Sequence, residues 1–293
     1  MESSMKIANH RFVDYWFGRS KDVGDAIPPP RFIVMHYTAG GDAAGSRDYM
    51  MLSPTQKQKR LGARKPVYAS AHLVVGRKGE TWQIVPFNYK ARHAGVSSWK
   101  GMNNLNLYSI GIEIANYGWL DKQPNGKYSR PGQTPEFSVE QIIVDQMPGS
   151  SRELKGWEIY PQAQIEQVER LTQALLDYYP SIVDIVRHQD ISPNRKFDPG
   201  PAFPMERIRS LLHERRSRGD DTDTDTPAHL YVTTTTLNIR GGAGIGFEKL
   251  TFSPLPPDTR LTVINEQDDW SFVRLVDTPE NTGWVYNKYL ALA

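Results

Sequence analysis

The sequence has no cysteine and no long apolar run. Without cysteine among its 293 residues, the chain can form neither disulfides nor thiolate metal sites, so any bound metal must be held by histidine and carboxylate side chains. No window approaches the roughly 20 apolar residues that a membrane-spanning helix needs. The opening stretch, MESSMKIANHRFVDYWFG, carries charge throughout and lacks an apolar segment of secretory length. We expect neither insertion into a membrane nor export by a simple signal peptide.

A strong charge of either sign is also missing. The 35 basic residues nearly balance the 33 acidic ones, which gives a formal net charge of +2. Such a weakly basic chain is compatible with an acidic polymer as partner but does not require one, and we predict no nucleic-acid partner. A hydrophobic fraction of 39% is sufficient for packed cores, and the length favours two domains.

The first 214 residues have the pattern of an α/β domain. Buried strands are predicted from apolar runs at residues 31–36, 109–115 and 181–187. A hairpin is predicted over residues 71–86, with its turn at Arg77-Lys78-Gly79. Apolar residues at helical spacing, preceded by a proline, predict a helix over residues 161–179. Together these elements predict a largely internal sheet covered by helices.

Three further segments differ in composition. Residues 117–154 are rich in Gly, Pro, Gln and Ser, and we expect a long surface excursion without an assigned role. The stretch RRSRGDDTDTDTPAH, residues 215–229, cannot bury apolar area and is predicted to be a solvated linker. Residues 230–293 contain short β-type runs separated by Gly, Pro, Asn and Asp, which predicts a small all-β barrel.

Two histidines stand where predicted strands give way to loops. His36 and His188 each follow an apolar run, and ligand sites in open α/β sheets gather outside the strand ends. Asp198 lies ten residues after His188, and Pro193 and Pro199 restrict the backbone around it. Two imidazoles and one carboxylate leave a fourth tetrahedral position for water, as in catalytic zinc sites. A histidine at a strand end is more often a hydrogen-bonded scaffold residue, so this pattern alone leaves both interpretations open.

Five motifs occur in the order found in a known enzyme family. They are VMHYTAG, SAHLVVGRKGETWQIVP, ARHAG, NNLNLYSIGIEIAN and RHQDISPNRKFDPGPAF, within about residues 31–212. In this order they resemble the zinc N-acetylmuramoyl-L-alanine amidases, a family that includes phage amidase lysozymes and the peptidoglycan recognition proteins. The resemblance implies a mixed sheet flanked by helices, with Zn²⁺ in a surface groove.

The resemblance assigns roles to individual residues. His36, His188 and Asp198 match the three zinc ligands, and Asp198 stands where some relatives use cysteine. Glu113 matches the catalytic glutamate, and Lys196 matches a lysine that stabilises the oxyanion. The implied partner is peptidoglycan, in which zinc-activated water would cleave the amide between the lactyl group of N-acetylmuramic acid and L-alanine.

The residues alone are less specific. An ionised Glu113 inside an apolar strand is costly unless it faces a cleft or a partner, and a cross-strand salt bridge is the simplest such partner. The resemblance reverses that preference. Lys196 would otherwise be a solvated loop lysine.

The remaining motif residues have weaker assignments. His93 is expected to line the groove, and Arg195 to be structural or in contact with substrate, so both are candidate substrate-binding residues. His72 is either a groove residue or a satisfied core histidine. Three further histidines lie outside the motifs: His10, His213 and His229.

The C-terminal region carries a second resemblance. Its segments LNIRGGAG, LTVINEQDDWSFVRL and TGWVYNKYL, within about residues 231–292, resemble the bacterial SH3-like domains appended to wall hydrolases. The resemblance implies attachment to peptidoglycan, through its stem peptide or cross-bridge. Trp270 and Trp284 belong to the barrel core or to a binding surface, and core is the commoner place for barrel aromatics.

The sequence therefore predicts a zinc amidase domain at 1–214, an acidic linker at 215–229 and a wall-binding SH3-like domain at 230–293. Lacking a signal peptide, such a chain would be an endolysin or a secreted effector, made in the bacterial cytoplasm and acting on the cell wall after release. Two alternatives stay open. One is a non-catalytic peptidoglycan recognition protein, and the other is a cytoplasmic amidase that recycles soluble anhydro-muropeptides.

Overall fold

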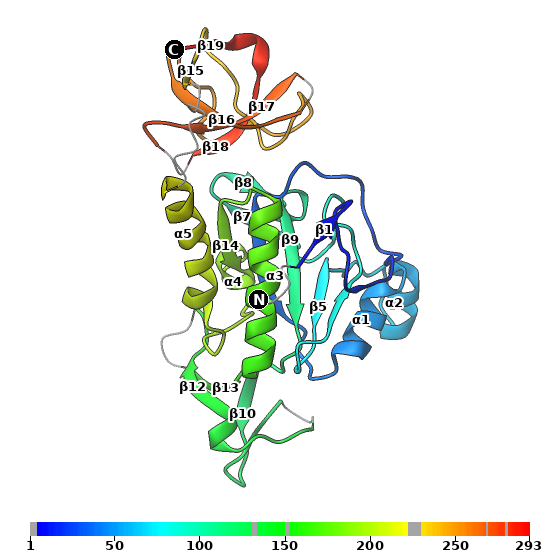
Figure 1. The fold of residues 1–293 in the computed structure, drawn as a ribbon. Helices are drawn as coiled ribbons and strands as arrows, with labels where there is room; N and C mark the ends of the chain where they lie inside the picture. Colours follow the sequence, from blue (N-terminus) through cyan, green and yellow to red (C-terminus); the bar gives the residue numbers. More distant parts are fainter. Residues whose placement is uncertain (1–4, 131–133, 150–152, 222–229, 268, 279–280) are drawn as a thin grey trace.

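The computed structural model describes residues 5–130, 134–149, 153–221, 230–267, 269–278 and 281–293. Figure 1 shows a small β-domain at one end of the molecule, an α/β part in the middle and a second small sheet at the other end. Among the described residues, none of the helices combines the length and the apolarity needed to cross a membrane.

A six-stranded mixed sheet forms the centre of the α/β part. In spatial order its strands are β14 (Asp184–Arg187), β4 (Phe32–Tyr37), β9 (Ser109–Ile114), β5 (Leu73–Val75), β6 (Thr81–Gln83) and β3 (Trp16–Phe17). The first four run parallel to one another, whereas β6 is antiparallel to β5. The mixed sheet, its three long apolar strands and its hairpin are confirmed.

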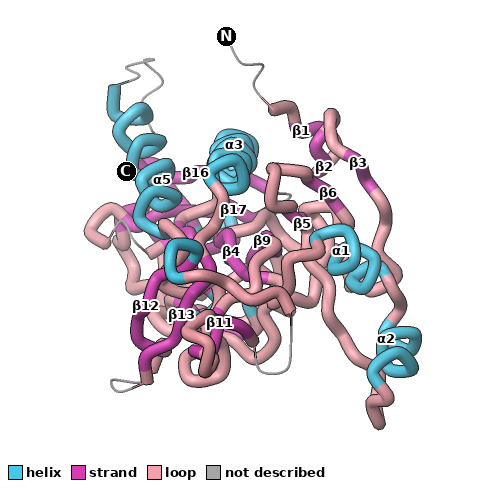
Figure 2. The backbone as a smooth tube through the Cα atoms, turned by 90° about the horizontal axis from the view of Figure 1, so that it is seen from below, coloured by secondary structure: helices cyan, strands magenta, loops and turns pink. Residues whose placement is uncertain are grey.

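Five helices accompany this sheet in the described residues: α1 (Ala43–Met51), α2 (Pro54–Leu61), α3 (Gln162–Tyr178), α4 (His188–Ile191) and α5 (Met205–Asp221). Alternation along β4 turns Ile33 and Met35 toward one core, which α3 and α5 cover, and Phe32 and Val34 toward the other. Figure 2 shows α3 and α5 side by side on their face of the sheet. Helix α3 confirms the helix expected over 161–179.

The first helices were not expected, although α2 has a local signal. Ser53 caps it and forms a capping box with Gln56, Pro54 is its first residue, and Gly62 ends it in the left-handed conformation at φ +62°. The remaining short elements are β1 (Ile7–Ala8), β2 (Arg11–Phe12), β7 (Ser98–Trp99), β8 (Met102–Asn103) and the 3₁₀ turns η1 (Leu105–Leu107), η2 (Val139–Gln141) and η3 (Asn287–Tyr289).

The described residues between 117 and 158 form what we call the excursion sheet. Its strands β10 (Trp119–Lys122), β11 (Tyr128–Ser129), β12 (Ile142–Gln146) and β13 (Leu154–Glu158) pair antiparallel in the order β11-β10-β13-β12. They enclose a small core of their own: Leu120, Tyr128, Phe137 and Ile142. The expected surface excursion is therefore an ordered sheet, built from strands too short to show a clear alternation.

The start of the expected linker is helical. Helix α5 continues to Asp221, so residues 215–221 belong to it. The Arg215 guanidinium donates to the backbone carbonyls of Leu176, Tyr179 and Ile182, which fixes this first residue of the expected linker at the end of α3. The rest of the expected linker, residues 222–229, lies outside the described residues.

The C-terminal β-domain, residues 230–293, is an antiparallel sheet in the order β18-β17-β16-β15-β19. Its strands are β15 (Leu230–Thr233), β16 (Arg260–Gln267), β17 (Trp270–Leu275), β18 (Thr282–Tyr286) and β19 (Leu290–Leu292). This confirms the all-β character expected for the region. Trp284 is fully buried in its core, whereas Trp270 is partly exposed.

The C-terminal β-domain packs directly on the α/β part. Buried residues of both parts, such as Phe32 and Val34 on one side and Leu261 and Val273 on the other, belong to one hydrophobic cluster. Arg31, at the start of β4, is only 3% exposed and donates to the Thr282 hydroxyl across this interface. Burial at this interface lowers the pKa of Arg31 to about 9.

Candidate metal centre and active site

The candidate ligands meet at one edge of the central sheet. His36 lies near the end of β4, and His188 directly follows β14, the parallel neighbour of β4. Parallel strands end at the same edge, so their terminal side chains come together there. Asp198 reaches them from the loop after α4, which the Gln189 N–H closes by donating to the Asp198 carbonyl at 3.0 Å. All three candidate ligands are buried.

Their ligand atoms converge closely. Nδ1 of His36 lies 2.8 Å from Nδ1 of His188, and Oδ2 of Asp198 lies 2.9 Å from each of these nitrogens. Burial, and then the neighbouring His188, lower the pKa of His36 to about 4. His36 is therefore neutral near pH 7, which is the form that binds metals.

The other ring nitrogens determine which tautomers are present. Nε2 of His188 lies 3.1 Å from the Ala94 carbonyl, which can only accept, so this nitrogen carries the proton and Nδ1 presents a lone pair. On the other side, the Ser109 hydroxyl donates to the Leu105 carbonyl at 2.5 Å, which leaves its oxygen to accept from Nε2 of His93 at 3.3 Å.

The same reasoning assigns the tautomer of His36. With its proton on Nε2, His93 offers a lone pair on Nδ1, and Nε2 of His36 donates to it at 3.0 Å. Nδ1 of His36 therefore also faces the cluster with a lone pair. Two imidazole lone pairs and a carboxylate oxygen repel one another at these distances unless a cation lies among them.

This donor set fits a divalent metal ion. His36, His188 and Asp198 supply two nitrogens and one oxygen, the ligand types of catalytic zinc sites, and three ligands leave one tetrahedral position open. The outer ring nitrogens donate to His93 and to the Ala94 carbonyl, as ligating histidines usually do to partners behind them.

Glu113 is the register partner of His36 on the adjacent strand β9. Its Oε2 is buried without a hydrogen-bond partner, and burial, reinforced by Asp198, holds the pKa of Glu113 well above its usual range. The salt bridge considered from the strand alone is absent among the described residues. Glu113 therefore faces the ligand cluster as a carboxyl group with spare hydrogen-bonding capacity.

Lys196 and Arg195 lie on the loop that carries Asp198. Lys196 lines the same cavity as the cluster, and its charge opposes the rise in the pKa of Glu113. Arg195 also lines the cavity, but its guanidinium donates to the carbonyls of Ala94 and Val96 and braces the loop against them. These contacts are structural, which is one of the two roles that the sequence left open for Arg195.

His72 of the hairpin and His93 of the ARHAG motif have different surroundings. His93 lines the cavity, as expected, and also holds His36 through its ring nitrogen. His72 is fully buried, accepts from the Gly111 N–H at 3.0 Å and donates to the Tyr89 carbonyl at 3.0 Å, so it is a satisfied core histidine. His10 bonds Tyr179, while the His213 side chain and His229 lie outside the described residues.

The ligand cluster, Glu113 and Lys196 share one cavity of about 510 Å³. Its walls include residues that the sequence did not single out: Tyr37, Tyr68, Arg92, Trp119 and Arg130. Tyr37 and Arg92 adjoin predicted site residues and could have been found from the motifs. The other three had no such signal, because their place in the wall depends on how distant segments fold back.

The sequence profile of one protein family, described as N-acetylmuramoyl-L-alanine amidase (Amidase_2), matches residues 27–201, which is more than half of the chain. The chain belongs to the N-acetylmuramoyl-L-alanine amidase family. The matched region contains the ligand cluster, Glu113 and Lys196, and it ends before the C-terminal β-domain.

Two curated members of this amidase family come from Escherichia coli (strain K12). The 1,6-anhydro-N-acetylmuramyl-L-alanine amidase AmpD is 35% identical over 144 residues, covering 49% of this chain and 58% of AmpD. The N-acetylmuramoyl-L-alanine amidase AmiD is 31% identical over 184 residues, covering 62% of this chain and 53% of AmiD. The matches therefore span little more than half the length of these relatives. A crystal structure of a Se-Met AmpD derivative, 27% identical, covers 71% of this chain and 99% of its own, with a TM-score of 0.49.

Proposed function

We propose that this amidase-family chain hydrolyses the amide between the lactyl group of N-acetylmuramic acid and L-alanine of the peptidoglycan stem peptide. One observation carries the proposal: the lone pairs of His36 and His188 and the carboxylate of Asp198 converge within 2.9 Å, in one cavity with Glu113, whose Oε2 is buried without a hydrogen-bond partner. The names of AmpD and AmiD, both amidases of this kind of linkage, support it.

The roles follow from the positions of the side chains. His36, His188 and Asp198 would hold Zn²⁺, which when bound lowers the pKa of water and polarises a carbonyl. Glu113 takes a proton from the attacking water and passes it to the leaving amine, as general base and then as general acid. Lys196 stabilises the negative charge that develops on the carbonyl oxygen.

The two candidate substrate-binding residues, His93 and Arg195, line the cavity and also support its structure. His93 contributes a cavity wall while fixing the tautomer of His36. Arg195 lines the cavity while its guanidinium donates to backbone carbonyls.

Digestion of purified sacculi tests the activity. We expect free peptides that begin at L-alanine, beside glycan with intact lactyl groups, as measured by mass spectrometry of the products. Chelation should abolish the release and added zinc should restore it. Binding to sacculi without any release of peptide would instead support the non-catalytic recognition protein.

A second candidate substrate is a soluble anhydro-muropeptide. The observation in its favour is that AmpD, at 35% identity, is named a 1,6-anhydro-N-acetylmuramyl-L-alanine amidase. Cleavage of soluble anhydro-muropeptides alone, with intact sacculi left untouched, would assign the chain to recycling. Cleavage of sacculi would favour action on the wall as an endolysin or secreted effector.

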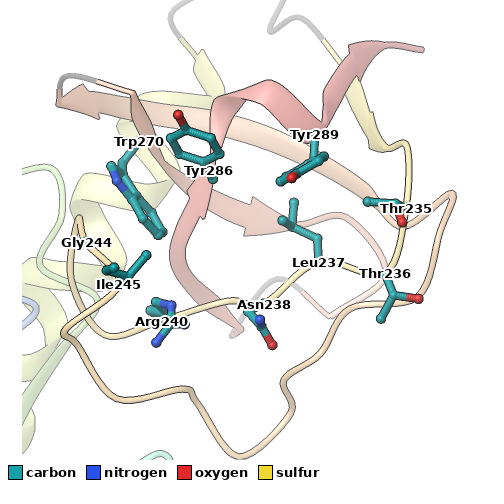
Figure 3. A pocket seen from close by; sticks show the side chains of 10 residues that line it. All are labelled: Thr235, Thr236, Leu237, Asn238, Arg240, Gly244, Ile245, Trp270, Tyr286 and Tyr289. Carbon is teal, nitrogen blue, oxygen red and sulfur yellow. The ribbon is translucent and has the colours of Figure 1, made fainter.

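We also propose that the C-terminal β-domain is an SH3-like module that binds the wall, within the division 1–214, 215–229 and 230–293. Figure 3 shows a groove in it, with Trp270, Tyr286 and Tyr289 along one wall and Asn238 and Arg240 opposite. Its volume of about 790 Å³ and its mixture of aromatic and polar side chains suit a segment of polymer.

The groove can be tested separately from catalysis. We expect Trp270→Ala to weaken co-sedimentation with sacculi while leaving turnover of a soluble muropeptide unchanged. Unchanged co-sedimentation would remove this groove from wall binding.

A further inference from the structure

The excursion sheet is fixed at its base by one buried carboxylate. Glu158, only 1% exposed, accepts from the backbone N–H of Tyr117 at 2.6 Å and forms an ion pair with Arg77 of the β5–β6 hairpin. The Asn116 side chain donates to the Glu158 carbonyl at 3.2 Å. The first and last residues of the excursion are thereby tied to each other and to the central sheet, so its position beside that sheet is defined.

A glycine brings the excursion sheet against the strand that carries His36. Gly118 has φ +73°, and a Cβ atom at this position would lie 2.4 Å from the ring of Tyr37. Tyr37 directly follows His36 at the end of β4. The absence of a side chain at Gly118 therefore allows the excursion sheet to form a wall of the catalytic cavity, to which it contributes Trp119 and Arg130.

Contacts on several sides orient the Arg130 guanidinium. Its Cζ lies 5.0 Å from the centre of the Trp119 ring and 6.0 Å from that of the Tyr37 ring, and its Nε donates to the Tyr117 carbonyl at 2.8 Å. The Lys155 ammonium, 5.1 Å from the Trp119 ring centre, adds a second cation to the same indole. Arg130 is therefore held on aromatic rings and a carbonyl, and no described carboxylate forms an ion pair with it.

The charges around the cavity favour an anionic ligand. Four cations and two carboxyl groups line it: Arg92, Arg130, Arg195 and Lys196 against Glu113 and Asp198. Arg92 is paired with Asp22 at 3.1 Å, and the Arg195 guanidinium is bound to carbonyls. Lys196 already acts on Glu113. Arg130 also has no ion pair among the described residues, but it holds the Tyr117 carbonyl through Nε and not through its terminal nitrogens. A guanidinium fork of this kind matches a carboxylate.

We propose that the excursion sheet recognises the peptide of the substrate. Arg130 binds a carboxylate of an acidic peptide, and the rings of Trp119 and Tyr37 hold its guanidinium in the orientation for that contact. This inference rests on the proposed function, in which the substrate joins an uncharged sugar arm to a peptide with free carboxylates. The peptide arm then lies toward the excursion sheet, and the specificity of the enzyme includes the charge of that peptide.

Two soluble substrates test this directly: an N-acetylmuramoyl tripeptide with free carboxylates, and the same molecule with every peptide carboxyl group amidated. We expect the zinc-loaded wild type to prefer the free acid. Arg130→Ala should raise KM for the acid by roughly 10- to 100-fold, with kcat and the KM for the amide little changed. Arg130→Lys should recover part of the loss, because it keeps the charge and loses the fork.

Lys122→Ala is the matched control, since Lys122 is an exposed cation on strand β10 that does not line the cavity. It should leave both KM values unchanged. The proposal would be overturned if the ratio of KM for the amide to KM for the acid differed less than twofold between Arg130→Ala and the wild type. An equal loss of kcat on both substrates would overturn it as well. Failure of the wild type to release peptide from either substrate would instead refute the proposed function.

Discussion

At the scale of single residues, a chain of hydrogen bonds prepares the ligand cluster. The Ser109 hydroxyl accepts a hydrogen bond from Nε2 of His93, and Nδ1 of His93 accepts one from Nε2 of His36. These bonds leave the lone pair on Nδ1 of His36, which faces the cluster. Gly111 makes room for it, because a Cβ there would lie 2.4 Å from the His93 ring. The orientation of a candidate metal ligand in β4 thus depends on residues in two other segments.

His93 should therefore control metal affinity. We expect His93→Leu, which removes the acceptor for Nε2 of His36, to weaken zinc binding by roughly 10- to 100-fold. His93→Asn, whose side-chain oxygen can accept near the position of Nδ1, should recover part of this loss. Competition with a chromophoric chelator measures the dissociation constants, with His10→Phe as a control outside the cavity. Equal affinities in the Leu and Asn variants would contradict the hydrogen-bond argument.

His72 should make stability depend on pH. Burial lowers the pKa of His72 to about 4, from 6.5 for an exposed imidazole. Between these values the unfolded chain binds a proton that the folded chain excludes, so the free energy of unfolding should fall as the pH falls from about 6.5 to 4. For this one group the loss is about 3 kcal/mol.

Urea unfolding of wild type and of His72→Gln at pH 7 and pH 5 isolates this contribution. The difference in stability between the two pH values should be smaller in the variant, which cannot titrate at this position. Identical pH dependence in both proteins would show that His72 is not held neutral by the fold.

At the scale of elements, the excursion sheet is the part that local sequence signals described least. Its apolar residues Leu120, Phe137 and Ile142 are widely spaced and come together only when the short strands pair. The long strands and α3 were predictable, because period-2 and 3.6-residue patterns are visible within one segment. A sheet of strands as short as the two residues of β11 has no such pattern.

Two glycines of the excursion sheet allow a matched test of its approach to β4. Gly118 and Gly126 have φ of +73° and +82°, so alanine strains the backbone at both. A Cβ at Gly118 would meet the Tyr37 ring at 2.4 Å, whereas nothing lies within 4 Å at Gly126. We expect Gly118→Ala to raise KM severalfold and to lower stability by about 1–3 kcal/mol more than Gly126→Ala does. Equal effects in the two variants would mean that the approach to Tyr37 is not tight.

At the scale of the whole molecule, the C-terminal β-domain is docked on the amidase domain. The sequence predicted a solvated linker before this domain and gave no indication of a contact between the two domains; in the structure, Arg31 and Thr282 meet across a buried interface. The interface lies at the start of β4, and His36 lies near the end of the same strand. The β-domain and the excursion sheet thus occupy opposite ends of the molecule (Figure 1).

Thr282→Val should destabilise the docked arrangement. It leaves the buried Arg31 without its hydroxyl acceptor, which we expect to cost about 1–3 kcal/mol in the free energy of unfolding. Thr236→Val, at an exposed threonine of the same β-domain, should change stability by less than about 0.5 kcal/mol. Urea unfolding measures both. A loss in Thr282→Val no larger than in the control would indicate a β-domain that is not held by this contact.

The sequence by itself determined which ligand types a metal site could use and where the long elements of this protein lie. Residue type excluded thiolate ligands, motif order pointed to His36, His188 and Asp198, and periodicity located the main strands and α3. Only the tertiary structure decided the tautomer of His36, the entry of Arg130 into the cavity and the docking of the C-terminal β-domain. The physical reason is that each of these depends on contacts between residues far apart in the chain, such as Arg31 and Thr282, which leave no periodic trace in either segment.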